Sequence, residues 1–186
     1  MTRRHGITSS TYTNIIIDSG AVYKDWGVSG GNTLLGATRG GSSFEVKTEI
    51  RHMDVDGARG LVKLGERITN VEVVLVANFI EISSDLLNYA LPGSDVTTTT
   101  AAASWDTITR ALELATGDYF TNIAIVGEVA GTTNPVVCIV KNPLSNGELS
   151  MTFADKEETA LPVTWNGHFT TSDLDTEPWE ILYPKS

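Results

Sequence analysis

Two strand-patterned runs that flank a long loop, between residues 36 and 83, constrain the fold most. The first run, Phe44 to Ile50, alternates apolar and charged residues, and the second, Ile68 to Ile82, is rich in β-branched residues. These patterns predict two β-strands. The loop between them, at about residues 52–67, is expected to bury almost nothing of its own. The sequence therefore predicts a long hairpin whose loop is completed by another subunit, which indicates assembly rather than chemistry.

The second strand of this hairpin is apolar on both faces. One face carries Val71, Val73, Leu75, Ala77 and Phe79, and the other carries Val74, Val76, Ile80 and Ile82. A strand of this kind is covered on both sides, so we expect it to be central in a sheet or to lie at an interface.

The length and composition of the chain indicate one ordinary globular domain, residues 1–186. Apolar residues make up 41% and charged residues 19%, which argues against disorder throughout. The apolar runs are too short to span a bilayer, and no secretory signal follows Met1. Cys138 is the single cysteine, so an intrachain disulfide is excluded and we expect the chain to be intracellular when it is made.

Charge is unevenly distributed along the chain. Residues 1–70 hold nine Lys/Arg and seven Asp/Glu, whereas residues 71–186 hold four and sixteen, for an overall charge of −10. An acidic protein is not attracted to DNA phosphate. Two regions of different charge suit head-to-tail association, although scattered surface carboxylates explain the same numbers.

Most of the remaining chain is expected to form short strands. We expect them at residues 14–18, 21–23, 122–129, 135–141, 148–154 and 161–170, and in the tail near residues 179–183. A turn at Ser145 to Gly147 suits a hairpin. The clearest helix is Ser84 to Leu91, capped by Ser83 or Ser84 and stopped by Pro92. The predicted fold is mainly β, an antiparallel β-sandwich or barrel with one short flanking helix.

Two segments after this helix are less regular. Residues 95–103 are rich in threonine and alanine, have little to bury, and are expected to form a mobile connection. Residues 105–114 fit a helix with Ser104 as cap or a strand, and intrinsic propensity alone favours the helix.

No catalytic, cofactor-binding or metal-binding set emerges from the sequence. His5, His52 and His168 have no metal-ligand spacing, and Cys138 lies in an apolar run where it is expected to be inert. Asp54 to Gly57 begins like a calcium loop but has Ala58 and Arg59 where ligand and glycine are required. The glycine-rich residues 36–43 lack the lysine of a phosphate loop and lead into a strand.

Acidic clusters and tryptophans allow weaker alternatives. Residues 155–158 and 173–177 contain paired carboxylates, which a hydrolase would need to converge in a cleft. We expect solvated acidic turns instead. Trp26, Trp105, Trp165 and Trp179 are spread along the chain, and packing is a better explanation than sugar stacking.

Six segments follow one another in a distinctive order, at residues 36–46, 55–63, 122–127, 137–142, 161–169 and 173–181. Their order and spacing resemble those of the tail tube (major tail) proteins of long, flexible-tailed bacteriophages. The resemblance covers roughly residues 30–183.

This resemblance implies a structural protein without enzymatic residues, a two-sheet β fold and a virion location. Its subunits would close into six-membered rings that stack into a tube for DNA ejection. The implied partners are further copies of the chain, the tape-measure protein and the tail terminator. DNA would pass without specific binding, and no membrane would be involved. The family also implies a strand, not a helix, at residues 105–114, and we follow it.

If the resemblance holds, three surfaces can be assigned. The ring-stacking loop would use Val55, Asp56, Gly57, Arg59, Lys63 and Arg67. The lateral interface would use Val74, Val76 and Ile80. The lumen wall would carry Glu45, Glu49 and Glu72, although Lys47 and Arg51 interrupt an acidic surface there. The alternative functions are a tail terminator or other head or tail protein, a carbohydrate-binding β-sandwich, and a small β hydrolase.

Overall fold

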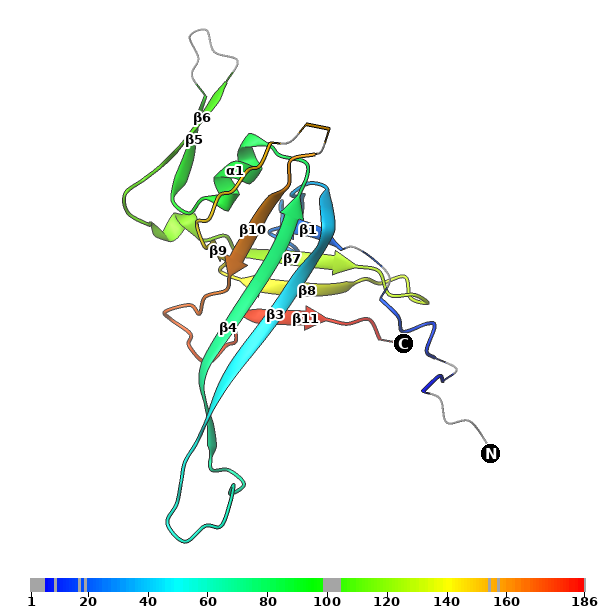
Figure 1. Ribbon diagram of the computed structural model, residues 1–186, viewed down its shortest axis with the longest axis vertical. Helices are drawn as coiled ribbons and strands as arrows, with labels where there is room; N and C mark the ends of the chain where they lie inside the picture. The colour runs from blue at the N-terminus through cyan, green and yellow to red at the C-terminus, as the bar shows by residue number, and fades with distance from the viewer. Residues whose placement is uncertain are drawn as a thin grey trace.

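The computed structural model describes residues 6–8, 10–16, 18, 20–98, 105–153, 155–156 and 158–185. These residues form antiparallel sheets and one α-helix, and no barrel closes among them. The mainly β fold with a flanking helix is therefore confirmed, in a sandwich-like form. Figure 1 shows two sheets whose strands cross at a wide angle, as in orthogonal sheet packing.

The first sheet has five strands. In spatial order they are β11 (Trp179–Leu182), β8 (Val136–Lys141), β7 (Asn122–Gly127), β1 (Ala21–Lys24) and β2 (Thr33–Leu34). The apolar runs of β7 and β8 predict central strands, and the two pair along their whole length. Strands expected at residues 122–129, 135–141 and in the tail are confirmed with shorter bounds. Among the described residues of the first apolar block, β1 is the only strand, and Ile16 adds a single bridge to Val129.

The second sheet has four strands and includes the expected long hairpin. Their spatial order is β3 (Thr38–His52), β4 (Glu66–Phe79), β10 (Leu161–Asn166) and β9 (Leu144–Ser145). β4 lies between β3 and β10, as its two apolar faces predicted.

The core lies where the two sheets meet. Leu75 and Phe79 of β4 and Trp165 of β10 are fully buried, and the Phe79 and Trp165 rings pack edge to face at 6.0 Å between centroids. The Trp165 indole donates a hydrogen bond to the Tyr89 carbonyl, 3.2 Å away, which fixes the helix against the sheet.

The helix α1 (Ser84–Ala90) begins as predicted. The Ser83 side chain accepts a hydrogen bond from the Leu86 amide at 3.1 Å, and Leu86 and Ala90 are buried against the sheets. The Ser145 hydroxyl donates to the Ala90 carbonyl and satisfies the end of the helix.

The chain after α1 forms a second, smaller hairpin. β5 (Ser94–Thr98) pairs with β6 (Asp106–Arg110), and a 3-10 turn, η1 (Thr116–Asp118), follows. The strand expected from the resemblance is present at 106–110, whereas the helix favoured by propensity is wrong. The mobile connection expected from residue 95 is wrong over 95–98, which are strand, and residues 99–103 lie outside the described part. Cross-strand pairing with β6 overrides the local composition.

Two further strand expectations are wrong. Residues 148–153 form no strand, because β9 pairs with β10 over only two residues and the chain then leaves the sheet, so no hairpin follows Gly147. Phe153 is 80% exposed as a result. The strand expected at 161–170 ends at Asn166 because Gly167 passes close to β8. A Cβ at Gly167 would lie 2.9 Å from the Val140 side chain.

Candidate assembly surface: the β3–β4 arm

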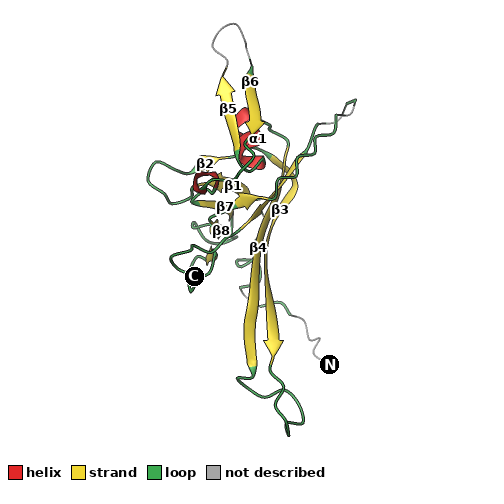
Figure 2. Cartoon of the chain, turned by 90° about the vertical axis from the view of Figure 1, so that its left-hand side faces the viewer, coloured by secondary structure: helices red, strands yellow, loops and turns green. Residues whose placement is uncertain are grey.

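The outer half of the long hairpin projects away from the sheets, and we call residues 48–70 the arm. Figures 1 and 2 show its two strands and terminal loop extending beyond the rest of the molecule. All residues of β3 from Lys47 to Arg51 and of β4 from Glu66 to Asn70 are exposed. The expected loop at 52–67 corresponds to residues 53–65, between the paired residues His52 and Glu66.

The arm separates from the core because its sequence loses the pattern that buries one face. Val46, Val71 and Val73 still pack on the core, and a register shift between Glu49 and Ile50 then interrupts the ladder. A bulge of this kind increases local twist and turns a hairpin away from its sheet.

Apolar side chains nevertheless continue along the arm. Ile50 and Ile68 lie directly opposite each other and are 61% and 62% exposed. The loop adds exposed apolar residues: Met53, Val55, Leu61, Val62 and Leu64. A cluster of this extent on a projecting hairpin is typical of a surface that a partner covers.

The cations of the arm are not neutralised by nearby acids. Arg51, Arg59, Lys63 and Arg67 make no ion pair with any carboxylate in the described part of the chain. Arg51 and Arg67 even lie directly opposite each other. Like charges in this position are destabilising, and an external acidic partner would relieve the repulsion.

The terminal loop is closed by a few backbone hydrogen bonds. The Met53 amide donates to the Gly65 carbonyl at 2.7 Å, and the Gly65 amide donates to the Val62 carbonyl at 2.9 Å. Gly57 has a φ of 88°, which suits glycine. Leu64 has a φ of 73° although it is not glycine, which costs roughly 1–2 kcal/mol. The loop therefore holds a largely exposed leucine in an unfavourable backbone conformation.

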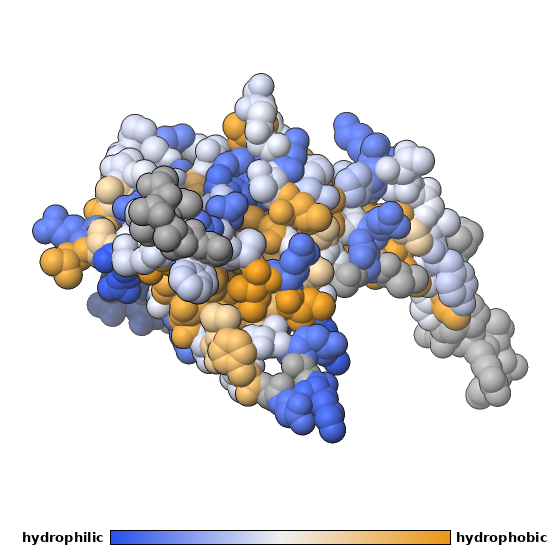
Figure 3. All heavy atoms as spheres, turned by 90° about the horizontal axis from the view of Figure 1, so that it is seen from above, coloured by the Kyte–Doolittle hydropathy of each residue, from blue (hydrophilic) through white to orange (hydrophobic). Residues whose placement is uncertain are grey.

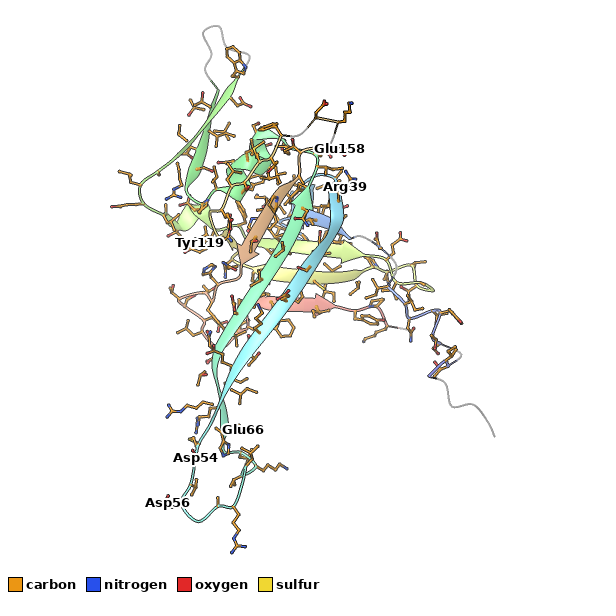
Figure 4. All side chains as sticks on the ribbon, in the orientation of Figure 1. Arg39, Asp54, Asp56, Glu66, Tyr119 and Glu158 are labelled. Carbon is orange, nitrogen blue, oxygen red and sulfur yellow. The ribbon has the colours of Figure 1, made fainter. Side chains whose placement is uncertain are left out.

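The predicted ring-stacking residues are all located on this arm. Val55, Asp56, Gly57, Arg59 and Lys63 are exposed in the loop, and Arg67 lies at the start of β4. Figure 4 shows Asp54 and Asp56 on the loop and Glu66 at its base. His52 closes the base, with Nε2 3.8 Å from Asp54 Oδ1 and a buried Nδ1 that has no hydrogen-bond partner among the described residues.

The predicted lateral and lumen residues share one face of the sheet. Glu45 is directly opposite Val74, and Lys47 is directly opposite Glu72, so these side chains point to the same side. Val74, Val76 and Ile80 are half-buried, whereas Glu45, Glu49 and Glu72 are exposed. Lys47 pairs with Glu45 at 3.2 Å, which partly neutralises the acidic surface.

A hollow of about 600 Å³, which the sequence did not indicate, lies beside η1, and we call it the η1 hollow. It is lined by Leu114, Ala115, Thr116, Tyr119, Phe120, Thr121, Asn142, His168, Phe169, Thr170 and Thr171. Tyr119, labelled in Figure 4, packs edge to face on His168 at 5.2 Å. His168 belongs to the segment 161–170 that was expected to be a strand. Because β10 ends at Asn166, His168 instead turns half-buried into this hollow.

The acidic clusters have local structural roles. The pKa of Asp173 is lowered by hydrogen bonds from the Thr176 hydroxyl and the Asp175 amide, which cap a turn. The pKa of Glu158 is lowered by a backbone hydrogen bond and by exposed Arg39, 2.5 Å away. Both carboxylates are exposed to solvent, as expected for solvated acidic turns.

The described residues contain no group of three or more His, Cys, Asp or Glu placed to hold a metal ion. Cys138 is half-buried in β8, where burial raises the pKa of its thiol and disfavours the reactive thiolate. Among the tryptophans, Trp165 is buried, Trp26 packs on Tyr23, and Trp105 is 75% exposed just before β6. No ring contact joins two tryptophans in the described part of the chain.

None of the described helices is long and apolar enough to cross a membrane. No family model and no curated protein matches the chain.

Proposed function

We propose that this chain is a structural subunit of the tail tube of a long, flexible-tailed bacteriophage. Copies would close into rings, six-membered as the resemblance implies, and the rings would stack into the conduit through which DNA leaves the virion. Its partners would be other copies, the tape-measure protein and the tail terminator.

One observation carries this proposal: the arm exposes apolar residues and cations that the rest of the described chain does not cover. Ile50 and Ile68 are cross-strand neighbours in solvent, and burying each would contribute roughly 1.5–3 kcal/mol. A monomer does not obtain this stabilisation, because the two side chains stay in solvent. A polymer would obtain it at every contact between subunits.

Lateral contact between subunits is supported by the edge of the second sheet. β3 lies at the end of the strand order, so the outer side of its 15 residues is not paired within the sheet. A long open edge favours pairing with other chains and therefore aggregation. Pairing of the edges within a closed ring removes this risk of aggregation.

The charge on one face of the second sheet favours its proposed role as the wall of the DNA channel. Glu45, Glu49 and Glu72 share the polar face of β3 and β4 with Lys47 and Arg51, so acids outnumber these two cations by one. Such a wall does not bind phosphate.

The decisive experiment is negative-stain electron microscopy of the purified full chain at high concentration, beside a variant that lacks residues 57–65. We expect tubes from the full chain and folded monomers from the deletion variant, checked by circular dichroism. Rings that do not stack would indicate a terminator. Normal tubes from the deletion variant would refute the role of the arm, and absence of any polymer would refute the proposal.

A further inference from the structure

We infer that Asn146 is a site of spontaneous covalent modification, where the fold leaves an asparagine–glycine pair open to deamidation. The substrate is the side-chain amide and the co-reactant is water. The products are ammonia and either aspartate or isoaspartate at position 146. The inference is independent of the proposed assembly. It rests on two identical dipeptides, Asn146–Gly147 and Asn166–Gly167, which the structure places in opposite environments.

The reaction needs only the chain itself and water. The amide nitrogen of the glycine loses its proton to solvent and attacks the Cγ of the preceding asparagine. A C–N bond forms and closes a five-membered succinimide, the bond between Cγ and Nδ2 breaks, and the leaving nitrogen takes up a proton and departs as ammonia. Water then opens the ring at either carbonyl, with no oxidation or reduction. Glycine favours this attack because it carries no Cβ to hinder the approach.

The side chain that would be attacked is exposed and polarised. Asn146 directly follows β9, is exposed to solvent, and accepts a hydrogen bond at Oδ1 from the Glu148 amide, 3.2 Å away. This bond folds the side chain back along its own backbone and polarises the side-chain carbonyl, as a donor does at an oxyanion site. The segment runs past α1 towards the end of the molecule seen in Figure 3, where hydrophilic residues are exposed among apolar ones.

The attacking atom, the Gly147 nitrogen, is only weakly held. Its hydrogen is donated to the Ser145 hydroxyl oxygen, 3.2 Å away, and that hydroxyl donates its own proton to the Ala90 carbonyl. The Gly147 amide donates to no backbone carbonyl within the part of the chain that the structure describes. One long hydrogen bond to a hydroxyl is therefore the main restraint on this nitrogen.

Asn166–Gly167 has the same sequence but is protected. Asn166 is the last residue of β10, which pairs with β4 on one side and β9 on the other. The Gly167 amide donates to the Val73 carbonyl at 2.9 Å, and a Cβ placed at Gly167 would lie 2.9 Å from the Val140 side chain. Attack on Asn166 would require this hydrogen bond to break and the nitrogen to move inside packed structure. The fold, rather than the dipeptide, therefore decides which asparagine reacts.

Conversion would alter a junction between β9, β10 and the end of α1. The Asn146 amide donates to the Thr164 carbonyl at 3.0 Å, and a Cβ at Gly147 would lie 3.3 Å from the Pro92 ring. Isoaspartate inserts a methylene into the backbone at this crowded point, and either product adds one negative charge. We therefore expect the modified protein to be more acidic and to unfold at a lower denaturant concentration.

Peptide mapping of the aged full-length protein tests the inference. Folded protein is kept at mildly alkaline pH and digested with trypsin, which cuts after Lys141, Lys156 and Lys185 and so separates the two sites. Mass spectrometry detects the replacement of NH by oxygen, fragment spectra assign the residue, and a sample digested at once gives the background. We expect Asn146 to convert at least about tenfold faster than Asn166, the factor that one buried hydrogen bond corresponds to.

The same incubation in concentrated guanidinium chloride is the matched control, because unfolding removes the environments that distinguish the sites. There Asn166 should convert at least about tenfold faster than in the folded protein, and the two rates should become similar. Asn146→Gln, whose longer side chain would have to close a six-membered ring, should remove the main acidic species that ion exchange resolves from the aged wild-type protein.

Two results would overturn the inference. Equal rates at Asn146 and Asn166 in the folded protein would show that the fold protects both sites or neither. A tenfold difference that persists in denaturant would show that neighbouring residues in the sequence, and not the fold, set the two rates.

Discussion

Arg51 lies directly opposite Arg67 across the two strands of the arm, and neither has a carboxylate partner among the described residues. A cross-strand pair of like charges opposes the hairpin that it belongs to. An acidic surface on another molecule, as the proposed assembly requires, would relieve this repulsion.

Substituting Arg67→Glu tests this explanation. The introduced carboxylate would face Arg51 and should stabilise the isolated protein by about 0.2–1 kcal/mol, because repulsion becomes attraction. Polymerisation should be weaker at the same time, since the partner's acidic surface now faces a carboxylate. Urea unfolding measures the first effect and sedimentation of polymer measures the second. Lys156→Glu, an exposed change of equal charge, should leave polymerisation unchanged.

Ile50→Ser and Ile68→Ser should separate assembly from folding. Both side chains are more than half exposed in the single chain, so each change should alter the free energy of unfolding by no more than about 1 kcal/mol, the range of an exposed cross-strand pair. Polymerisation should be lost if a neighbour covers this pair. Electron microscopy and urea unfolding give the two readings, with Phe153→Ser as the matched exposed apolar control. A large loss of stability would show that the pair already packs within the subunit.

The long hairpin, α1 and the central strands were predictable because their determinants are local. Period-two apolar residues define β4, and the Ser83 cap and Pro92 bound α1. Each signal is confined to a few neighbouring residues, so no knowledge of distant contacts is required.

The errors came from elements whose state depends on distant partners. Residues 148–153 alternate like a strand, but they pair with no other strand, because the pairing with β10 ends after the two residues of β9. Propensity over residues 105–114 favoured a helix, but residues 106–110 form β6 and pair with β5. The η1 hollow was not predictable because its walls come from residues 114–116, 119–121, 142 and 168–171, which only the fold brings together.

Trp165→Ala should be the most destabilising single change that removes side-chain volume from the core. Trp165 is fully buried, packs on Phe79 and donates to the Tyr89 carbonyl. Loss of this contact and hydrogen bond should lower the free energy of unfolding by about 3–5 kcal/mol. Urea unfolding measures it, and Trp105→Ala, at the exposed position before β6, should change stability by less than about 0.5 kcal/mol.

The turn at residues 173–176 should lose stability in acid. Hydrogen bonds from Thr176 and Asp175 favour the ionised form of Asp173, so its pKa is lower in the folded protein than in the unfolded chain. The stabilisation is therefore complete above the unfolded pKa and is lost as the pH falls through the folded one. Titration of the Asp173 carboxyl carbon by NMR, in buffer and in concentrated urea, should show the lower pKa in the folded state. Thr176→Val, which removes the hydroxyl donor, should raise the folded value towards the unfolded one. Equal values in buffer and urea would mean that this cap does not form in solution.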